Sequence, residues 1–395
     1  MKTSTNRRLP PDPVGLPPAG KLAFAVAGEV IRKADRQHPA DTVLRNELAA
    51  RRHLTPEAKS QISHAVFAYY RWRGWLNVGI PMPELLEQAL ALSERFAERP
   101  ESFPIDDLRT RAIPHWVESE VEVSPGWLRA LQTEPRLWLR ARPGQGKALA
   151  QKLGDCRIAG TGPLSEAVEY RGRMDLFRTP EFHAGDFELQ DVNSQVAGLL
   201  CHPQPGETWW DACAGEGGKM LHLSDLMENK GLIWASDRSA WRLRILKRRA
   251  ARARVFNYRA VDWDGAARLP TKTKFDGVLA DAPCSGLGTW HRNPHARWTT
   301  TPQDLKELAE AQFQLLAHVV PAIKPGGRLI YSVCTLARTE TIEVADRFSA
   351  AFPEFQPALL AHPWQERADR SARLWFWPQD GGGNGMFVAA WVRKS

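Results

Sequence analysis

The sequence predicts a doubly wound α/β domain with a largely parallel sheet, preceded by an all-helical domain. From Trp209 onward, apolar strands, glycine turns and helices follow one another repeatedly, an order typical of a parallel sheet covered by helices. No strand signal stands before about Leu137. The apolar strands each end on a polar or small residue, and ligands of such sheets bind beyond the carboxyl ends of the strands.

Composition limits the class of protein. The chain has 395 residues, of which 43% are apolar and 25% charged, so two or three globular domains are expected. A net charge of +8 favours a polyanionic partner, although charge alone speaks only to solubility. No apolar run reaches the roughly 18 residues of a membrane span. Residues 1–20 are basic and proline-rich without the apolar core of a secretion signal, and we expect a flexible tail.

The cysteines indicate a reducing compartment. There are five of them, an odd number, and no pair has CxxC spacing. A disulfide framework or a zinc site is therefore not expected. We expect a cytoplasmic protein that is monomeric and has neither a metal nor a membrane partner.

The elements follow in order along the chain. Residues 21–134 have helical periodicity, as in KLAFAVAGEVIRKA, and Thr55 is a plausible helix start. Residues 135–205 start with a strand-like PRLWLRARPG and continue as a small α+β segment. Residues 206–395 form the α/β domain, and its final 22 residues before Ser395 read as two antiparallel strands around a glycine-rich turn. The strands of the α/β domain are expected in TWWDACAGEGGK, LIWASD, YRAVD, FDGVLADAP and GGRLIYSVCTL.

A glycine-rich loop follows the first strand of this domain and opens a helix. The loop contains Gly215, Gly217 and Gly218, and glycines let the backbone approach a ligand closely. The second strand ends on Asp237, whose carboxylate could accept both hydroxyls of a ribose. The third ends on Asp262, which could reach an adenine amino group, with Asp264 as its rival. These features fit either a dinucleotide or S-adenosylmethionine, but the GxGxxG and P-loop patterns are both absent.

Two cysteines stand at neighbouring strand ends. DAPCSG ends the fourth strand with Asp281 and Cys284, and the fifth strand ends at Cys334. A thiolate that adds to carbon 6 of cytosine makes carbon 5 nucleophilic enough to attack a methyl donor, while a carboxyl group holds the base edge. Lone cysteines are more often packing residues. That is our interpretation of Cys156 and Cys201, and Cys213 is expected to have a packing or backbone-contact role.

These residues resemble the RsmB/NSUN family of RNA cytosine-5 methyltransferases over roughly residues 135–395. DACAGEGGK is similar to the family's DxCAAPGGK loop, and DAPCSGLGTWHRNPHARW is close to its DAPCSGxGxxRRxPxxKW run. YSVCTL resembles YxTCS, and LWLRARP and ELQDVNSQVAGLL resemble the segments before the loop. The helical first third, with RRHLTPEAKSQISHAVFAYYRWRGWLN, resembles the NusB-like RNA-binding domain of bacterial rRNA-modifying members.

The resemblance implies a fold and a set of roles. The fold would be a Rossmann-like class I S-adenosylmethionine-dependent methyltransferase domain with a mostly parallel seven-stranded sheet, after an RRM-like segment. Cys334 would be the nucleophile, Cys284 would assist product release, and Asp281 with Lys219 would complete the catalytic set. RNA, most naturally rRNA, would be the substrate. The residues that would bind S-adenosylmethionine are Cys213, Ala214, Gly215, Glu216, Gly217, Gly218, Lys219, Asp237, Asp262 and Asp281.

Three positions depart from the family pattern. Glu216 adds a negative charge to the loop, Val333 replaces a threonine before the nucleophile, and Thr341 stands where the family has asparagine. None of them removes a catalytic group, but they indicate a divergent branch.

Two regions are expected to face RNA. Nine Lys or Arg residues and no acid lie between Arg238 and Arg259, which indicates either phosphate contacts or simply a solvated helix face. In HRNPHARW, the side chains of Arg292, Arg297 and Trp298 could contact the RNA backbone and position a flipped base.

Two other functions remain open on the same fold. A base-amine methyltransferase needs no nucleophilic thiol, so it would keep its activity when Cys334 is replaced. A non-catalytic RNA-binding or assembly protein would not bind the cofactor. The retained glycine loop, Asp281 and the two cysteines argue against the latter.

Overall fold

The computed structural model describes residues 19–364 and 370–395. The predicted flexible tail therefore lies outside the described residues, except for its last two positions. The chain divides into two compact units between Glu94 and Arg95. In the part of the chain that is described, none of the helices has the length and apolar character needed to cross a membrane.

The described part of the first unit is helical, as predicted. The helix predicted to start at Thr55 does so: the Thr55 side chain caps it by accepting a hydrogen bond from the Ala58 N–H at 3.2 Å. The buried side chains of the first unit include Ala27, Val30 and Ile62. Its helices are α1 (Ala19–Lys33), α2 (Ala40–Ala50), α3 (Pro56–Trp72) and most of α4 (Met82–Glu98).

The division lies earlier than the boundary at residue 134 that the sequence indicated. The helices α5 (Ile105–Ala112) and α6 (Pro125–Gln132) belong to the second unit. Long-range bonds explain this, because Glu120 accepts hydrogen bonds from the Thr339 N–H and Thr339 Oγ1. Helical periodicity identifies helices but not the domain with which they pack.

Residues 137–189 form the small α+β segment. All its strand pairs are antiparallel, in the order β2-β3-β1-β4. This order, with a helix after β1 and another after β3, is the split βαβ arrangement and agrees with the RRM-like prediction. The elements are β1 (Leu137–Ala141), α7 (Gly146–Leu153), β2 (Cys156–Ile158), β3 (Ala167–Tyr170), α8 (Pro180–Ala184) and β4 (Phe187–Leu189).

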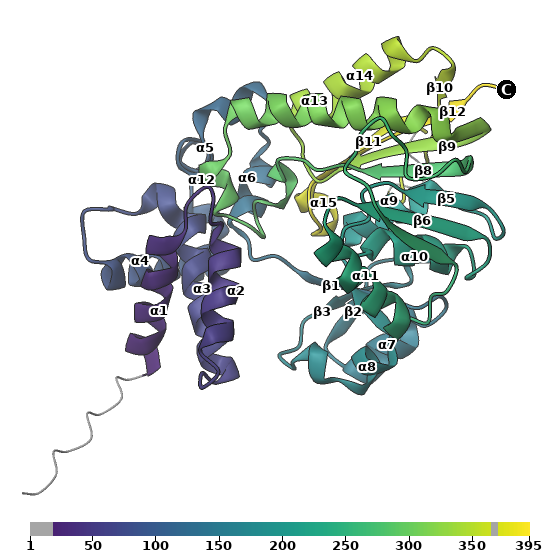
Figure 1. Cartoon of the computed structure of the whole chain (residues 1–395). Helices are drawn as coiled ribbons and strands as arrows, with labels where there is room; N and C mark the ends of the chain where they lie inside the picture. Colours follow the sequence, from purple (N-terminus) through teal and green to yellow (C-terminus); the bar gives the residue numbers. More distant parts are fainter. Residues whose placement is uncertain (1–18, 365–369) are drawn as a thin grey trace, which may run out of the picture. The chain divides into compact units, whose positions relative to one another are not determined.

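The described residues from Val192 onward form the predicted Rossmann-like domain (Figure 1). Its strands run in the order β10-β12-β9-β8-β5-β6-β7, and β11 pairs with β12, so the described residues contain eight strands rather than seven. The strands are β5 (Thr208–Asp211), β6 (Leu232–Asp237), β7 (Tyr258–Asp262), β8 (Phe275–Asp281), β9 (Ile323–Val333), β10 (Phe355–Pro357), β11 (Arg373–Phe376) and β12 (Met386–Arg393). The helices are α9 (Val192–Cys201), α10 (Gly218–Leu226), α11 (Ala240–Arg252), α12 (Ala296–Thr299), α13 (Pro302–Val319), α14 (Ile342–Ala351) and α15 (Pro378–Gly381).

The sheet is parallel where the functional residues were predicted. The strands β7, β6, β5, β8 and β9 pair in parallel. Strand β12 pairs with β9 in antiparallel fashion, and β10 and β11 pair with β12. Helices α9, α10 and α11 cover one face and α13 and α14 the other (Figure 1). Side chains alternate between the two layers along each strand, as Trp209 and Trp210 do. The carboxyl ends of the parallel strands therefore lie together at one edge.

Candidate active site

The glycine-rich loop connects β5 to α10. Gly215 and Gly217 have left-handed backbones, with φ of 53° and 87°. A Cβ atom on Gly217 would lie only 2.7 Å from Leu246 Cγ, so this position has room for glycine alone. The Gly215 N–H donates to Asp237 Oδ2 at 3.0 Å. The loop and the acid that ends β6 are therefore linked directly, and Cys213 lies half-buried within the loop.

A pocket of about 400 Å³ opens at the end of β7, lined by Asp262, Asp264, Arg238 and Arg268 among others. Asp264 Oδ1 accepts the Ala266 N–H at 3.0 Å and so stabilises its own turn. Asp262 is exposed and forms no such bond within the described residues. Of the two rivals, Asp262 has the carboxylate that is less engaged by the protein.

Lys219 reaches from the first turn of α10 to Asp281 at the end of β8. Its Nζ lies 2.7 Å from Asp281 Oδ2, and Ser332 Oγ donates to Asp281 Oδ1 at 2.8 Å. Burial lowers the pKa of Lys219, but the Asp281 carboxylate outweighs this and the net pKa is raised. Lys219 therefore stays charged, and Asp281 is held by side chains from two neighbouring elements.

Asp211, the last residue of β5, is a site residue that the sequence identified only as a strand end. Its side chain is fully buried. Burial, and then the negative charge of Asp281, raise the pKa of Asp211 to about 8. This carboxyl group is consequently protonated at neutral pH, whereas Lys219, eight positions later in the sequence, is charged.

The two predicted thiols lie together. The strands β8 and β9 are paired with Asp281 opposite Ser332, so the loops that follow them are neighbours. Cys284 Sγ and Cys334 Sγ are 3.3 Å apart. The hydrogen bond to Cys334, and then burial, raise the pKa of Cys284 well above its usual value. Cys284 therefore stays a protonated thiol at neutral pH.

Glu340 anchors both cysteine loops, although the residue pattern did not single it out. Its side chain is 0% exposed, just before α14. Oε1 accepts from the Ser285 N–H at 2.8 Å, and Oε2 accepts from Ser285 Oγ and from Thr335 Oγ1. Ser285 and Thr335 each follow one of the two cysteines. The carboxylate thus bridges the residue after Cys284 and the residue after Cys334.

Gln312 and Tyr331 complete this buried network. Gln312 Nε2 donates to Glu340 Oε1 and to the Pro283 carbonyl, both at 2.9 Å. Tyr331 Oη donates to Gln312 Oε1 and to the Glu340 carbonyl. Burial raises the pKa of Glu340, and the hydrogen bonds from Ser285, Gln312 and Thr335 offset this only in part. The loops that carry the two thiols are therefore linked through Glu340 to Gln312 of α13.

The structure corrects one predicted RNA contact. Arg297 is 0% exposed, and its guanidinium donates to the Ala112 and Leu131 carbonyls and to Gln132 Oε1. It secures the helical segment before β1 and is not available to a phosphate. Arg292 and Trp298 are only partly buried. The prediction for those two residues remains open.

The departures from the family pattern also have locations. Val333 is buried among apolar side chains on the α13 and α14 face of the sheet, whereas Cys334 packs against the opposite layer. Thr341 is buried and donates to the Ala337 carbonyl. The Glu216 side chain is exposed. Cys201, expected to be a core residue, is fully buried.

Comparison with known proteins gives consistent matches. Residues 198–392 match the family model of the 16S rRNA methyltransferase RsmB/F. The chain is 35% identical over 239 residues to the probable ribosomal RNA small subunit methyltransferase B of Bacillus subtilis, covering 59% of this chain and 54% of that protein. It is 33% identical over 271 residues to the protein described in the same words from Synechocystis sp., covering 66% and 58%.

A solved structure is similar as well. The crystal structure of a methyltransferase homolog protein from Pyrococcus horikoshii is 25% identical and superposes with a TM-score of 0.59, covering 68% of this chain and 90% of that chain. The chain spans little more than half the length of the two curated relatives it matches.

Proposed function

We propose that this chain, whose residues 198–392 belong to the RsmB/F methyltransferase family, methylates carbon 5 of a cytosine in RNA with S-adenosylmethionine as the methyl donor. The observation that carries the proposal is the thiol pair, with Cys284 Sγ and Cys334 Sγ 3.3 Å apart beside the Lys219–Asp281 pair. Two thiols at adjacent strand ends suit an addition and elimination reaction on a pyrimidine ring. The names of the relatives support small-subunit ribosomal RNA as the substrate class. A protein that acts on this RNA would work in the cytoplasm.

The described residues fit the cofactor. The left-handed backbones of Gly215 and Gly217 keep the loop free of side chains at the sheet edge where ligands of such folds bind. In this proposal Asp237 holds the ribose, and Asp262, which lines the pocket of about 400 Å³, holds the adenine. When bound, S-adenosylmethionine supplies an electrophilic methyl group. The residues that would hold it are Cys213 to Lys219, with Asp237, Asp262 and Asp281.

The thiols take different roles in this proposal. The Cys334 thiolate forms a bond to carbon 6 of the cytosine, and carbon 5 becomes nucleophilic and takes the methyl group. A base then removes the proton from carbon 5, the carbon–sulfur bond breaks, and Cys334 leaves with the bonding electron pair. The raised pKa of Cys284 supports its role as the partner that stays protonated and can donate to the departing sulfur.

Asp281 and Lys219 act on the base edge. The carboxylate of Asp281 accepts a hydrogen bond from the exocyclic amine of cytosine. Lys219 Nζ binds one oxygen of that carboxylate at 2.7 Å, and Ser332 Oγ binds the other. A charged, oriented acceptor stabilises the adduct more than a free one because it needs no reorganisation.

The decisive experiment traps the adduct. RNA and S-adenosylmethionine are incubated with the Cys284→Ala and Cys334→Ala variants, and covalent protein–RNA products are resolved on a denaturing gel. Cys284→Ala should accumulate an adduct, and Cys334→Ala should form none and lose methylation.

Other results would select other functions. A trapped adduct with Cys334→Ala instead would reverse the two roles. Full methylation by Cys334→Ala would indicate base-amine transfer, and no calorimetric binding of the cofactor would indicate a non-catalytic protein. Bisulfite mapping of RNA from a strain without this protein would identify the target nucleotide.

A further inference from the structure

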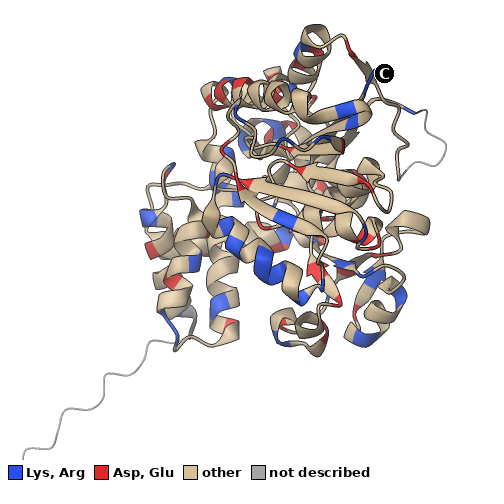
Figure 2. Cartoon of the chain, turned by 45° about the vertical axis from the view of Figure 1, so that its right-hand side comes forward, with Lys and Arg blue, Asp and Glu red and all other residues tan. Residues whose placement is uncertain are grey.

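The cation-rich segment from Arg238 to Arg259 contains two groups of cations with different surroundings. Figure 2 shows Lys and Arg gathered along α11, the helix near the centre of that view. Three of its side chains, Leu243, Leu246 and Ala250, are buried and attach it to the sheet. The direction of each cation relative to this buried stripe decides what it can bind.

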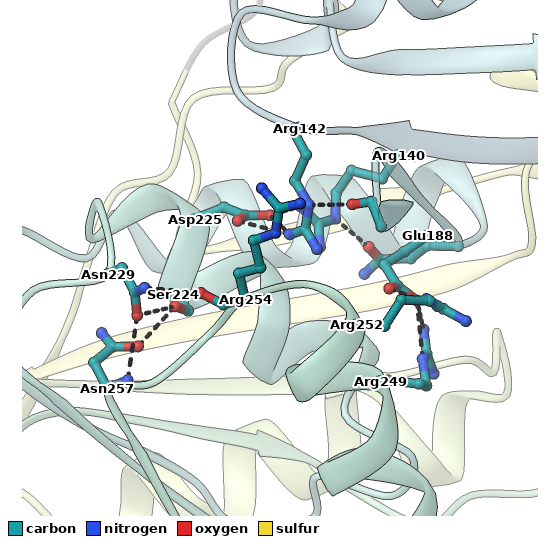
Figure 3. Close-up of polar contacts among 12 residues, drawn as sticks. Arg140, Arg142, Glu188, Ser224, Asp225, Asn229, Arg249, Arg252, Arg254 and Asn257 are labelled. Carbon is teal, nitrogen blue, oxygen red and sulfur yellow. Dashed lines mark hydrogen bonds and ion pairs between the residues drawn. The ribbon is translucent and has the colours of Figure 1, made fainter. Parts of the chain in front are cut away.

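Two of the cations on α11 are structural. Arg249 Nη2 and Arg252 Nη2 lie 2.9 Å and 2.7 Å from the carboxylate of Glu188, which is 1% exposed at β4 (Figure 3). A buried carboxylate requires such partners. These two arginines therefore hold the small antiparallel sheet against α11 and are not available to a ligand.

The other group faces outward. Arg244, Lys247 and Arg248 are exposed, and none of them forms an ion pair with a residue that the structure describes. Helical spacing aligns Trp241, Arg244 and Arg248 (i, i+3, i+7) on one stripe, with Lys247 beside it. Trp241 is 50% exposed. We call these four residues the outer face of α11.

Some exposed cations elsewhere in the described chain pair with acids, whereas those of the outer face of α11 do not. Lys33 contacts Glu29 and Glu47, and Arg347 contacts Glu310. A row of three cations without an acid repels itself, so it is disfavoured unless a polyanion binds there. An exposed indole ring within such a row adds a surface on which an unpaired base can stack.

The small sheet does not offer the stacking surface that free RRM domains use. Trp138 of β1 and Glu169 of β3, which pair and point to the same face of the sheet, are both buried. Arg140 of β1 and Arg142, which follows β1, both form ion pairs with Asp225 of α10 (Figure 3). These ion pairs cover this face of the sheet. RNA that approaches this domain has to be held by another surface.

We propose that the outer face of α11 binds the phosphate backbone of the RNA beside the target nucleotide, with Trp241 stacking on an unpaired base. The inference rests on the proposed function only in taking RNA as the partner. Strand β6, from which α11 departs, lies three places from β9 in the sheet, or about 14 Å at a spacing of about 4.8 Å per strand. The outer face thus contacts nucleotides that flank the base at Cys334.

The test measures binding without catalysis. A fluorescein-labelled, unstructured RNA that contains no cytosine is titrated with the full chain at several KCl concentrations, and anisotropy gives Kd. The triple variant Arg244→Ala, Lys247→Ala, Arg248→Ala should bind at least about tenfold more weakly at low salt. The slope of log Kd against log[KCl] should fall by about 2, since each phosphate contact on a single strand contributes about 0.7.

A second variant separates stacking from charge. Trp241→Ala should weaken binding about tenfold with the salt slope unchanged, because a stacked base releases no counterions.

A matched control removes the same net charge elsewhere. Lys152, Arg178 and Lys306 are exposed cations on other elements, and their triple alanine variant should keep the wild-type Kd and slope. Equal losses in both triple variants would show a general charge effect and overturn the inference. So would unchanged binding by the α11 triple, or wild-type protein that does not bind this RNA. If the wild-type protein binds polyglutamate and the α11 triple variant does not, the partner of this surface is an acidic protein instead.

The outcome is independent of the methylation chemistry. If Cys284→Ala forms an adduct but the α11 triple variant binds RNA as wild type does, the proposed function stands and this binding surface is rejected. A reduced salt slope in the α11 triple without any adduct in Cys284→Ala would do the opposite.

Discussion

Replacing Glu340 should disable the thiol pair without touching either thiol. In Glu340→Ala the hydroxyls of Ser285 and Thr335 can still bond each other across 3.1 Å, and Gln312 Nε2 keeps the Pro283 carbonyl. The Ser285 N–H, however, loses its acceptor. An unsatisfied buried donor costs about 1–3 kcal/mol, and the vacated volume adds to this.

The expected magnitude follows from these terms. A total near 3 kcal/mol would lower the unfolding temperature of the second unit by about 6 °C at roughly 2 °C per kcal/mol for a large domain. Because the residues after both cysteines lose their common anchor, displacement of the thiols by about 1 Å should reduce kcat about 100-fold. The cofactor loop does not contact Glu340, so cofactor affinity should be unchanged.

The matched variant is Glu340→Gln. One amide oxygen still accepts from the Ser285 N–H, and the amide nitrogen can donate to the Ser285 and Thr335 hydroxyls. This variant should unfold within about 2 °C of wild type and retain kcat within about fivefold. Single-turnover methylation, calorimetric cofactor titration and differential scanning calorimetry measure the three quantities. Wild-type kcat in Glu340→Ala would refute the reasoning, and equal damage in both variants would show that the negative charge itself is required.

Two further predictions concern the cofactor side of the sheet. The pKa of Asp211, about 8 in the folded state against 3.8 for an ordinary aspartate, means that the native state binds the extra proton, so this group lowers stability as pH rises from about 4 to 8. Asp211→Asn should therefore gain stability relative to wild type between pH 5 and pH 8 in thermal unfolding, and a difference that does not vary with pH would contradict the assignment. Gly217→Ala should lose about 2–4 kcal/mol of stability and at least about tenfold in cofactor affinity, since it adds overlap with Leu246 to left-handed strain. Gly326→Ala, with φ of 74° and open space around it, carries the strain alone and should keep wild-type cofactor affinity.

The sequence predicted the residues that end buried strands and missed those that depend on distant packing. Asp237, Asp281 and Cys334 could be found because an apolar run that stops on a polar group indicates a parallel strand end. Glu340 could not, because an acid in a short turn before a helix reads as solvated. Only the fold brings the hydroxyls of Ser285 and Thr335 together at its carboxylate.

The arginines illustrate the same limit. Arg297 was expected to touch RNA because it follows a catalytic motif, yet its guanidinium serves backbone carbonyls of residues 112 and 131, far away in the sequence. Arg249 and Arg248 are adjacent in the sequence, and only the position of Glu188 makes one structural and leaves the other outward. The charge pattern predicts a basic helix. Which of its arginines stabilise the fold and which are free to bind a ligand depends on tertiary contacts.

Asp281 connects the cofactor side of the site to the thiol side. Lys219, which bonds one oxygen of Asp281, belongs to the first turn of the helix that the glycine loop opens. Ser332, which bonds the other oxygen, precedes Cys334 by two residues on β9. A carboxylate held from both sides cannot move without disturbing either the loop or the nucleophile strand. If the loop shifts when the cofactor binds, Lys219 would carry that shift to the acceptor for the base edge, so the order in which cofactor and RNA bind should depend on this lysine.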